Sequence, residues 1–581
     1  PIISVLYKPS EIVRRLDSLK KGIVQEMKVL HFKEFLDRYA DASLAMCEAI
    51  RELSPEGGRL DIEPGRYDFY PQMAREGYYC ISNNDQGLKR IAMPLIHARN
   101  IVIDGHGAEF HLFGYMMPVV LDHSENILLQ NFTVEYDRPF YTEGWIEEAN
   151  EREITVKIDA ERFPYTVRDG EIHFSGYEWD VTGIHSFLEY APDTRDLVPG
   201  TADFYTLGRK ILAEELPGGR VRLRLAEGTF PFPMQAGNIA VISHATRNNP
   251  GIFGTESRDL RYENVTIHHC EGMAFIHQLC ENIRLERCRV VPSEGRMISA
   301  AADATHFVNC TGTVELKDCA FFSQLDDATN VHGIYTLVKD IVGNRLYLRY
   351  MHFQQEGIPL YRPGDTIRLL KCASMESFGQ AQVRKVETIN NQVVCVEVDE
   401  LPRGAAEGDG AENISRMPTQ TTITGCTTGR NRARSFLISC TGKVRIEDND
   451  LHPNGAAVWI SGDCNYWYES GPVSEVEICN NRIVNTHGGI AGWGRAAIEI
   501  VPEIVQRKAY YHGSVTVRGN EFVQQQSEIV HALCVENLLV SDNRIFCEQE
   551  DADDSAPIIV AEHCRVQAEN NTVNRTAVLV Q

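Results

Sequence analysis

The sequence has no run of 18 consecutive apolar residues, and it has neither a CxxC pair nor a His spacing suited to zinc. The first absence excludes a transmembrane helix, and the second leaves no motif for a structural metal. Positive charge is also scarce, because 57 Lys and Arg residues face 81 Asp and Glu residues, which gives a net charge of −24 at pH 7. Such a chain repels polyanions, so nucleic acid and acidic polysaccharides are not expected partners. We expect no metal and no cofactor.

The 16 cysteines are scattered along the chain, and several lie inside apolar, strand-like stretches. A free Cys in such a position behaves as a small buried hydrophobic residue. We therefore expect most of them to be core thiols, with disulfides as the alternative. Free thiols favour a reducing compartment and hence a cytoplasmic location. The chain begins with Pro rather than Met, so a secreted or periplasmic location after removal of a leader stays open.

Helical periodicity is absent from most of the chain, and a repeated strand-like phrase takes its place. Each phrase alternates apolar and polar residues and ends in Asn or Cys, with steps of 23 to 39 residues between phrases. Units of this length bury their apolar faces only by stacking on one another. The pattern predicts an all-β protein built on a right-handed parallel β-helix of the pectin-lyase type, with a hydrogen-bonded ladder of Asn side chains. The phrases end at Cys288, Cys319, Asn449, Asn481, Asn520, Asn543 and Asn571.

A solenoid also suits the length of 581 residues, which exceeds the ~250–300 residues that one compact core can serve. The open end of such a stack must be covered. An amphipathic stretch that runs through about residue 52 predicts a capping helix for this purpose. Its apolar residues at helical spacing are Phe32, Phe35, Tyr39, Met46, Cys47 and Ile50.

Two segments lack the Asn-terminated phrase and carry antiparallel-looking patterns, such as residues 221–225 and 392–398. Each segment is long enough for an inserted β-barrel-like subdomain. The second insertion is expected to wall a groove, because it follows directly on the acidic phrase described next. The expected division is an N-terminal segment with the capping helix (1–56), first β-helix turns (57–136), a first insertion (137–245), turns with the acidic phrase (246–334), a second insertion (335–420) and C-terminal turns (421–581).

One short phrase occurs twice, 24 residues apart: residues 302–306 read Ala-Asp-Ala-Thr-His, and residues 326–330 read Asp-Asp-Ala-Thr-Asn. Asp303 thus falls in register with Asp327, and neighbouring turns of a β-helix lie about 4.8 Å apart. Asp303, Asp326 and Asp327 would crowd onto one face, provided that the strand ends or bulges at Asp326. The same alignment of strand ends adds His277 and Asp463 to this face.

Cleavage of a glycosidic bond needs one carboxylic acid to protonate the departing oxygen and one carboxylate to activate water or attack carbon. Crowding supplies both, because like charges keep one member of the cluster protonated at neutral pH. We therefore predict a glycoside hydrolase with Asp303, Asp326 and Asp327 as catalytic residues. The plainest alternative is that these residues cap turns.

Three other functions stay open from the residues alone. A polygalacturonase-like hydrolase also places paired Asp residues on a β-helix. It would want basic residues to meet uronate charges, and this sequence has no Gly-His-Gly that is followed by a nearby Arg-x-Lys. A lyase would need a Lys or Arg base, usually with calcium. A non-catalytic carbohydrate-binding β-helix, such as an adhesin, would keep its binding after loss of the three carboxylates.

Residues 303–307, 324–333 and 465–471 resemble glycoside hydrolase family 110. That family contains inverting α-1,3-galactosidases that remove terminal galactose from blood-group-B-type structures. The resemblance covers most of the chain, including a β-helix interrupted by β-barrels. It implies an exo-acting enzyme that cleaves terminal α-1,3-linked galactose from B-antigen-like or linear Galα1-3Gal glycans with inversion. It also implies that Asp303 is the general acid and that Asp326 and Asp327 are the candidates for the base.

Further residues are candidates for binding the sugar, because they flank the carboxylates or offer polar or aromatic groups. Solvated or turn-forming roles are the alternative for each. Arg434 is the best candidate of a basic cluster whose other members, Arg430 and Arg432, are expected on a solvated face. A galactose-terminated oligosaccharide or glycoconjugate is the expected partner, and exposed β-helix flanks make a homodimer a reasonable expectation. The full set is Glu256, Arg296, Asn330, His332, Arg434, Asp463, Trp467 and Glu469.

Overall fold

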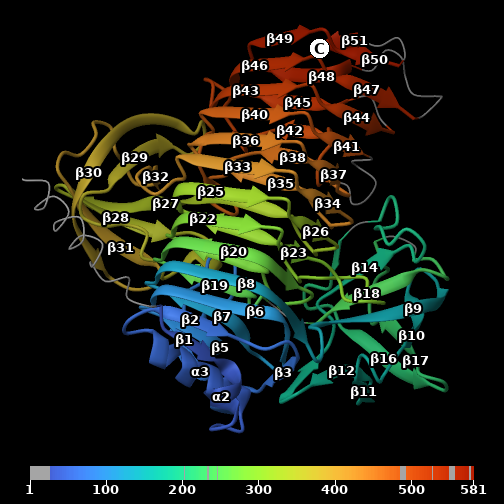
Figure 1. The fold of residues 1–581 in the computed structure, drawn as a ribbon. Helices are drawn as coiled ribbons and strands as arrows, with labels where there is room; N and C mark the ends of the chain where they lie inside the picture. The colour runs from blue at the N-terminus through green and yellow to red at the C-terminus, as the bar shows by residue number, and fades with distance from the viewer. Residues whose placement is uncertain are drawn as a thin grey trace, which may run out of the picture.

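The computed structural model describes residues 27–201, 203–231, 234–244, 247–484, 492–525, 528–548, 557–574 and 578–580. Parallel strands stack along the molecule as the turns of a β-helix, with the C-terminus at the far end from the helices (Figure 1). Two insertions built of antiparallel strands interrupt the stack. The predicted all-β class and the interrupted β-helix are therefore confirmed.

The first long sheet of the β-helix contains 22 strands. Its turns pair in parallel register, so that equivalent side chains lie above one another. Val444, Val476, Val515, Leu538 and Val566, for example, occupy equivalent positions in successive turns. The strands are β1 (Val29–His31), β2 (Gly58–Asp61), β3 (Arg66–Phe69), β6 (Arg99–Leu112), β8 (Glu125–Tyr136), β20 (Arg258–Ile267), β22 (Glu281–Glu286), β23 (Arg289–Val290), β25 (Thr311–Lys317), β26 (Ala320–Phe322), β33 (Gln420–Thr424), β34 (Thr427–Gly429), β36 (Lys443–Glu447), β37 (Asp450–His452), β40 (Glu475–Cys479), β41 (Arg482–Val484), β43 (His512–Arg518), β44 (Glu521–Gln524), β46 (Val535–Ser541), β47 (Arg544–Cys547), β49 (Val566–Glu569) and β50 (Thr572–Val573).

The second long sheet of the β-helix carries the acidic phrase. Its strands are β4 (Arg75–Tyr79), β5 (Gly87–Ile96), β7 (Met117–Asp122), β19 (Ile252–Thr255), β21 (Phe275–Gln278), β24 (Thr305–Val308), β27 (Thr329–Val342), β35 (Phe436–Ser439), β38 (Val458–Ile460), β42 (Ile498–Ile500), β45 (Val530–Leu533), β48 (Pro557–Glu562) and β51 (Val578–Val580). Apart from the β4–β5 hairpin, these strands pair in parallel from turn to turn.

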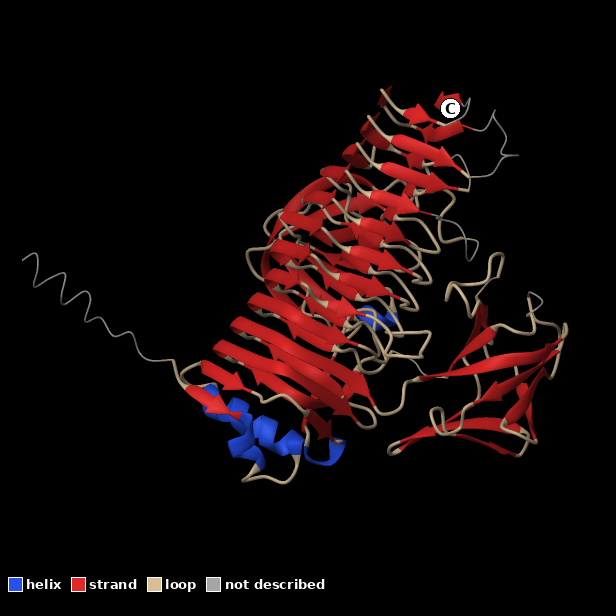
Figure 2. Cartoon of the chain, turned by 45° about the vertical axis from the view of Figure 1, so that its right-hand side comes forward, coloured by secondary structure: helices blue, strands red, loops and turns tan. Residues whose placement is uncertain are grey.

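The N-terminal cap is two helices, α2 (Phe32–Leu36) and α3 (Ala42–Leu53), where the sequence predicted one continuous helix. The break has a local cause: the Asp41 carboxylate accepts a hydrogen bond from the backbone N–H of Leu44 at 2.9 Å and so starts α3. Both helices lie over one end of the strand stack and bury apolar residues such as Phe35 and Ile50 there (Figure 2). Residues 1–26 of the expected N-terminal segment lie outside the described residues. The predicted role of the helices as a cap is confirmed.

The predicted Asn ladder is present in the C-terminal turns. Each Asn side chain donates to the next, with Nδ2–Oδ1 distances of 2.9 to 3.0 Å from Asn449 through Asn481, Asn520 and Asn543 to Asn571. The backbone N–H of each donating residue bonds to the same oxygen. Each buried amide is thereby satisfied within the turn corner, as a buried polar group must be.

Cysteines occupy the equivalent corner in earlier turns, at Cys288, Cys319 and Cys426. The ladder begins where the backbone N–H of Cys426 bonds to Asn449 Oδ1 at 2.8 Å. All 16 cysteines are free thiols and twelve of them are buried, which agrees with the expected core role. The same turn corner is thus occupied by a small, largely apolar Cys side chain in the earlier turns and by a hydrogen-bonded Asn amide in the later ones.

The first insertion is a seven-stranded antiparallel sheet with a smaller three-stranded sheet. The large sheet contains β9 (Tyr141–Ala149), β10 (Glu153–Ile158), β14 (Ser186–Tyr190), β15 (Phe204–Tyr205), β16 (Ile211–Leu216), β17 (Arg220–Leu225) and β18 (Ile239–Ser243). The small one contains β11 (Tyr165–Arg168), β12 (Glu171–Gly176) and β13 (Trp179–Thr182).

The second insertion closes into a barrel, because β27 pairs with both β28 and β32. The remaining strands are β28 (Arg345–Tyr350), β29 (Thr366–Lys371), β30 (Glu376–Thr388), β31 (Val393–Val398) and β32 (Gly410–Asn413), and β39 (Glu469–Ser470) also pairs with β27. The 3-10 helices are η1 (Pro71–Met73) and η2 (Phe353–Gln355). In the view of Figure 1 the two insertions project from opposite sides of the β-helix. Since β27 begins as a β-helix strand and continues into the barrel, the second insertion is anchored beside the acidic phrase.

Candidate active site

The acidic phrase forms one column across three successive turns. Thr305 pairs with Thr329, and Thr329 pairs with Phe436, so Asp303, Asp327 and Arg434 occupy equivalent positions. The backbone N–H of Asp327 donates to Asp303 Oδ1 at 3.1 Å, and that of Arg434 donates to Asp327 Oδ1 at 2.8 Å. The 24-residue repeat thus places the two carboxyl groups on adjacent turns, as the sequence predicted.

Asp327 is fully engaged by Arg434. The guanidinium donates from Nε to Oδ1 and from Nη2 to Oδ2, both at 2.8 Å, in the bidentate geometry that favours arginine. Its side chain is only 2% exposed. Burial raises the pKa of Asp327 to about 7, with neighbouring Asp326 and Asp303 adding to the rise and Arg434 opposing it.

Asp326 has a different environment although it is the next residue. Both Asp326 and Asp327 lie in the bend before β27, so strand alternation does not separate them. Arg247 Nη2 donates to Asp326 Oδ2 at 2.5 Å, and Arg432 Nη2 donates to Oδ1 at 3.4 Å. Burial acts to raise the pKa of Asp326, but the guanidinium groups of Arg432, Arg247 and Arg434 outweigh it and lower this pKa below the usual value. With 13% of its side chain exposed, Asp326 is the most accessible of the three carboxylates.

Asp303 is the opposite case. Its Oδ2 atom lies 2.6 Å from Nδ1 of His306, and its side chain is 4% exposed. Burial, the negative charge of Asp326 and that of Glu469 raise the pKa of Asp303 well above its usual value, against the effect of Arg247. Neighbouring carboxyl groups whose pKa values move in opposite directions are the arrangement that acid/base catalysis requires.

Three arginines compensate the negative charge of the cluster. Oxygen atoms of Asp303, Asp326 and Asp327 come within 4.8 Å of one another, close enough to share a cation. However, Arg247, Arg432 and Arg434 already donate to the oxygens of Asp326 and Asp327. This donor set leaves little need for a metal ion.

The first insertion and the C-terminal turns both contact the arginines of the cluster. In the first insertion, Asp203 forms an ion pair with Arg432 Nη1, and Tyr205 Oη lies 3.2 Å from the same nitrogen. The guanidinium carbons of Arg432 and Arg434 lie 4.7 and 5.0 Å from the ring centroid of Trp493. Arg432 is 4% exposed, so the expectation of a solvated face for this residue is wrong. Its burial follows from pairing with carboxylates on two sides.

Glu469 joins the cluster from β39, which pairs with β27. Asn83 Nδ2 donates to Glu469 Oε1 at 3.0 Å, and Asn330 Nδ2 lies 3.4 Å from both carboxylate oxygens. His332 Nε2 is 3.6 Å from Oε1. Burial acts to raise the pKa of Glu469, but His332, His306 and Arg434 lower it below the usual value. The structure therefore brings Asn330, His332 and Glu469 together with the three Asp residues.

An aromatic rim lies next to Glu469. The ring of Trp467 packs on His352, with 4.5 Å between ring centroids, and on Tyr466 at 5.4 Å. Tyr466 and Phe353 are 66% and 62% exposed. Large aromatic side chains this exposed provide faces on which a sugar ring can stack.

Asp463 shapes this rim from beneath. Its carboxylate accepts hydrogen bonds from the backbone N–H groups of four consecutive residues, 465–468. The step from the preceding turn is 22 residues, as Val458 pairs with Phe436, whereas the sequence alignment assumed 23. In this register the position equivalent to Asp303, Asp327 and Arg434 is Ala456, so Asp463 lies seven residues beyond the column, and its oxygens bind the loop backbone.

Three predicted residues lie away from the cluster. Arg296 donates to Glu135 Oε1 at 2.8 Å, and Glu256 pairs with His123 at 3.1 Å and with Arg362. His277 is fully buried, with Nε2 2.7 Å from Tyr262 Oη, and it aligns with the core residue Phe307. These side chains have their partners elsewhere in the fold.

Sequence reasoning missed Arg247, Asn83, Asp203 and His306, and it placed Arg432 on the surface. His306 could have been found, because it belongs to the doubled phrase and pairs in register with Asn330. The other residues lie in loops or in an insertion, where no repeat signals their position.

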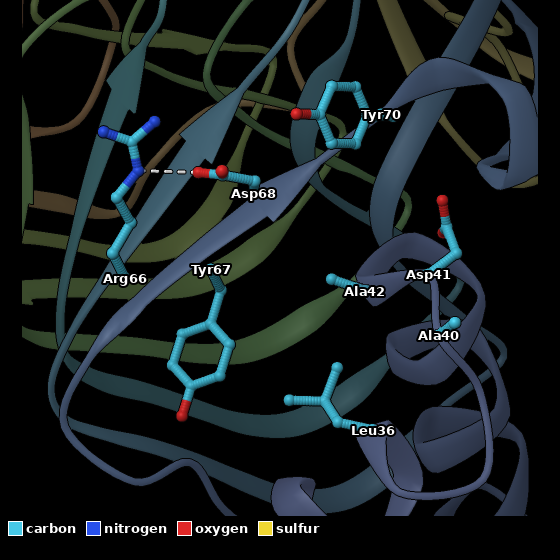
Figure 3. A pocket seen from close by; sticks show the side chains of 8 residues that line it. All are labelled: Leu36, Ala40, Asp41, Ala42, Arg66, Tyr67, Asp68 and Tyr70. Atoms are coloured by element: carbon cyan, nitrogen blue, oxygen red, sulfur yellow. Dashed lines mark hydrogen bonds and ion pairs between the residues drawn. The ribbon is translucent and has the colours of Figure 1, made fainter.

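A separate hollow of about 500 Å³ lies between the N-terminal cap and β3 (Figure 3). The only ion pair between its lining residues that Figure 3 draws joins Arg66 Nε to Asp68 Oδ1 at 2.7 Å. Its lining residues are Leu36, Ala40, Asp41, Ala42, Arg66, Tyr67, Asp68 and Tyr70.

In the part of the chain that the structure describes, no helix has the length and apolar character needed to cross a membrane.

Comparison with known proteins locates this fold and site in a family. Residues 142–239 match the GLAA-B beta-barrel domain I, and residues 345–410 match the GLAA-B beta-barrel domain II. The chain is 32% identical to Alpha-1,3-galactosidase B of Bacteroides thetaiotaomicron over 503 residues, which cover 84% of this chain and 81% of that protein. It is also 32% identical to Alpha-1,3-galactosidase A of Shewanella woodyi over 517 residues, 88% of this chain and 84% of that protein.

Likeness to solved structures is weaker. The Streptococcus pneumoniae surface protein and adhesin PfbA is 11% identical, with a TM-score of 0.42 over 95% of this chain and 99% of that one. A score this low carries no argument about function. The relatives, by contrast, match at 32% identity along most of their length. The chain belongs to the α-1,3-galactosidase family, glycoside hydrolase family 110, and is a glycoside hydrolase.

Proposed function

We propose that the protein is an exo-acting α-1,3-galactosidase that removes terminal α-1,3-linked galactose from B-antigen-like or linear Galα1-3Gal glycans. The observation that carries this proposal is the pair of neighbouring carboxyl groups with opposite pKa shifts, Asp303 and Asp326, on a chain of this family. A galactose-terminated glycan is uncharged at its reacting end, which suits a site whose cations are already paired with carboxylates.

In this proposal Asp303 is the general acid, because its raised pKa keeps a proton available at neutral pH. Asp326 is the base that activates water, since it is ionised and is the most exposed of the three. Asp327 orders the site: its backbone N–H holds Asp303 and its carboxylate holds Arg434. Asn330, Glu469 and the aromatic rim are the groups proposed to hold the sugar.

We propose inversion at the anomeric carbon. The support is the family resemblance, which implies inverting enzymes, together with an ionised Asp326 that can accept a proton from water. The oxygens of the cluster lie within 4.8 Å of one another at closest approach. Inverting pairs typically stand about 6.5–9.5 Å apart and retaining pairs about 5–5.5 Å. The close approach runs against inversion, so the product anomer is the decisive observation.

The test is hydrolysis of Galα1-3Gal and of a fucosylated B-type trisaccharide, followed by proton NMR from the first minutes, with Asp303→Asn in parallel. Early β-galactose, lost in the variant, is the expected result. Early α-galactose would overturn inversion and the base role of Asp326. No galactose from either substrate would overturn the proposed function. Relative rates on the two substrates decide whether the fucose branch is preferred.

We further propose a homodimer. Tyr78 and Leu88, which are cross-strand partners in the β4–β5 hairpin, are 63% and 60% exposed. An exposed apolar pair of this kind is commonly covered by a second chain. Analytical ultracentrifugation of the full chain and of Leu88→Glu tests it: a dimer that dissociates in the variant is expected, and a monomer in both overturns it.

A further inference from the structure

A chain of hydrogen bonds runs inward from Asp303 through two buried histidines. Asp303 Oδ2 lies 2.6 Å from His306 Nδ1, and His306 Nε2 lies 2.9 Å from His332 Nε2. His332 Nδ1 lies 2.7 Å from the carbonyl oxygen of Gly333, which ends the chain. The two imidazole planes are nearly perpendicular, at 82°, and neither side chain is more than 1% exposed.

The donors and acceptors of this chain fix its proton count. A carbonyl oxygen only accepts, so His332 Nδ1 carries a proton. If both rings are neutral, His332 Nε2 is then bare, and His306 must donate to it from Nε2. That leaves His306 Nδ1 bare, and only a protonated Asp303 can donate to it across 2.6 Å.

Every other complete arrangement keeps the same number of protons. The additional proton can reside on His306 or on His332 as an imidazolium, with Asp303 ionised. With Asp303 ionised and both rings neutral, two lone pairs would face each other, at either the 2.6 Å or the 2.9 Å contact. The geometry therefore requires one proton beyond those of two neutral rings.

We propose that Asp303, His306 and His332 store one proton for the reaction, and that the two histidines are positioning residues which keep Asp303 in its acid form. The proposal rests on the acid role proposed above for Asp303. Burial lowers the pKa of both His306 and His332 to about 4, so the stored proton resides on Asp303 near neutral pH.

The stored proton balances the proposed reaction. The proton of Asp303 passes to the glycosidic oxygen as the bond from that oxygen to C1 breaks, and the electron pair of the bond goes to the oxygen. Water adds to C1 and gives its proton to Asp326. Asp303 is then ionised and faces the bare Nδ1 of His306, and this repulsion favours its reprotonation. Asp303 regains one proton and Asp326 releases the one that it took from water, so both groups are restored for the next turnover.

Burial, Asp326 and Glu469 also raise the pKa of Asp303, so the test must remove the histidine chain alone. Glu469, Arg247, Asp327 and Asp326 are the remaining charged groups that act on His306 in the described structure. Its register neighbours on either side, Ile276 and Asn330, carry no charge. His332 is therefore the group whose removal tests the chain without touching Asp303.

The experiment compares His332→Leu with His332→Gln. The Gln amide oxygen can accept the Nε2–H of His306, whereas Leu cannot, so in the Leu variant His306 moves its proton to Nδ1 and favours ionised Asp303. For kcat/KM on Galα1-3Gal, we expect the alkaline limb of the pH profile of the Leu variant to lie about one pH unit lower than that of the wild type. At pH values above the limb, kcat/KM of the variant is then about tenfold below that of the wild type. The Gln variant should keep the wild-type limb. If both variants kept the alkaline limb at the pH of the wild type, and their melting temperatures were unchanged, the proposal would be overturned.

A substrate with an activated leaving group separates this role from a structural one. Departure of 2,4-dinitrophenolate needs no proton, so His332→Leu should lose at least tenfold less activity on 2,4-dinitrophenyl α-galactoside than on the disaccharide. An equal loss on both substrates would mean that the histidines only support the fold.

The chain can be tested even if the wild-type protein cleaves no galactoside. In ¹⁵N-histidine NMR spectra at pH 7, His306 is expected to carry its proton on Nε2 and His332 on Nδ1. Two neutral rings that both carry their protons on Nδ1 would show that the chain lacks the stored proton. Failure of hydrolysis with the expected spectrum would overturn the proposed function alone.

Discussion

At the residue scale, the charge on Asp326 depends on arginines that come from distant parts of the chain. Arg247 follows the first insertion and Arg432 follows the second, and their guanidinium groups lie 2.5 and 3.4 Å from opposite oxygens of Asp326. The Asp326 carboxyl would otherwise follow its burial and hold a proton, as Asp303 does. The division of labour between two similar carboxyl groups is thus made by neighbours rather than by the doubled phrase itself.

Arg247→Gln should raise the pKa of Asp326, because one of the positive charges that stabilise its ionised form is removed. If Asp326 is the base, the acidic limb of the kcat/KM profile on Galα1-3Gal moves to higher pH by about one unit. At pH values below the limb, the activity of the variant is then about tenfold lower than that of the wild type, and at pH values above the limb it is little changed. Stopped assays across pH 4 to 9 measure this.

Arg222→Gln is the matched control for Arg247→Gln. Arg222 pairs with Glu214 at 2.7 Å on the surface of the first insertion, away from the carboxylates. Its profile should coincide with that of the wild type. An Arg247 variant whose activity falls equally at all pH values would assign Arg247 to sugar binding instead.

At the element scale, the Asn ladder is the main polar support of the C-terminal turns. Asn520 is fully buried and donates to Ile478 O and Asn543 Oδ1, while its own Oδ1 accepts from the backbone and side chain of Asn481. Each of these groups has its partner only because the next turn repeats the residue. The ladder therefore couples neighbouring turns, in the way that solenoid stability depends on nearest-neighbour contacts.

Asn520→Ala should destabilise the protein by about 3 kcal/mol or more, because several buried donors and acceptors lose their partner at once. Asn571→Ala, at the half-buried end of the ladder, should cost less than half as much. Urea denaturation of both variants measures the difference, and hydrogen exchange should show faster opening confined to the turns around Asn520. Equal effects at both positions would contradict the coupling.

At the scale of the whole molecule, the parts of the fold that repeat could be predicted, and the parts that do not repeat could not. The Asn-terminated phrases predicted the β-helix, and the spacing of Asp303 and Asp327 predicted their stacking, because a parallel register carries sequence spacing directly into space. The break between α2 and α3 depended on one capping side chain, Asp41.

Residues outside the repeat follow no such rule. Arg247 reaches Asp326 only because the first insertion ends beside the acidic turn, which no spacing in the sequence encodes. Alignment of strand ends predicted Asp463 on the face of Asp303 and Asp327, but the register places Ala456 in that column and leaves Asp463 in the loop after β38. Site residues supplied by loops thus require the tertiary structure.

Buried carboxyl groups also make the stability of the whole molecule depend on pH. Glu271 is fully buried and accepts hydrogen bonds from the amides of Asn248 and Asn249. Burial raises the pKa of Glu271 to about 7, against the effects of these amides and of Lys89. Since the unfolded chain titrates near 4.3, stability from this group is full below about pH 4 and is lost as pH rises through about 7.

Glu271→Gln removes that titration. At pH 5 the variant should be slightly less stable than the wild type, because it has lost a hydrogen bond. As pH rises, the free energy of unfolding of the variant should increase relative to that of the wild type, by up to about 3 kcal/mol over the whole titration. Melting temperatures from pH 4.5 to 8.5 at one scan rate measure the difference. Glu477→Gln, at a side chain on β40 that is 40% exposed, is the control and should follow the wild type at every pH. If the melting temperature of the Glu271 variant changes with pH in the same way as that of the wild type, Glu271 is already ionised in the folded protein. The hydrogen bonds from Asn248 and Asn249 then outweigh its burial.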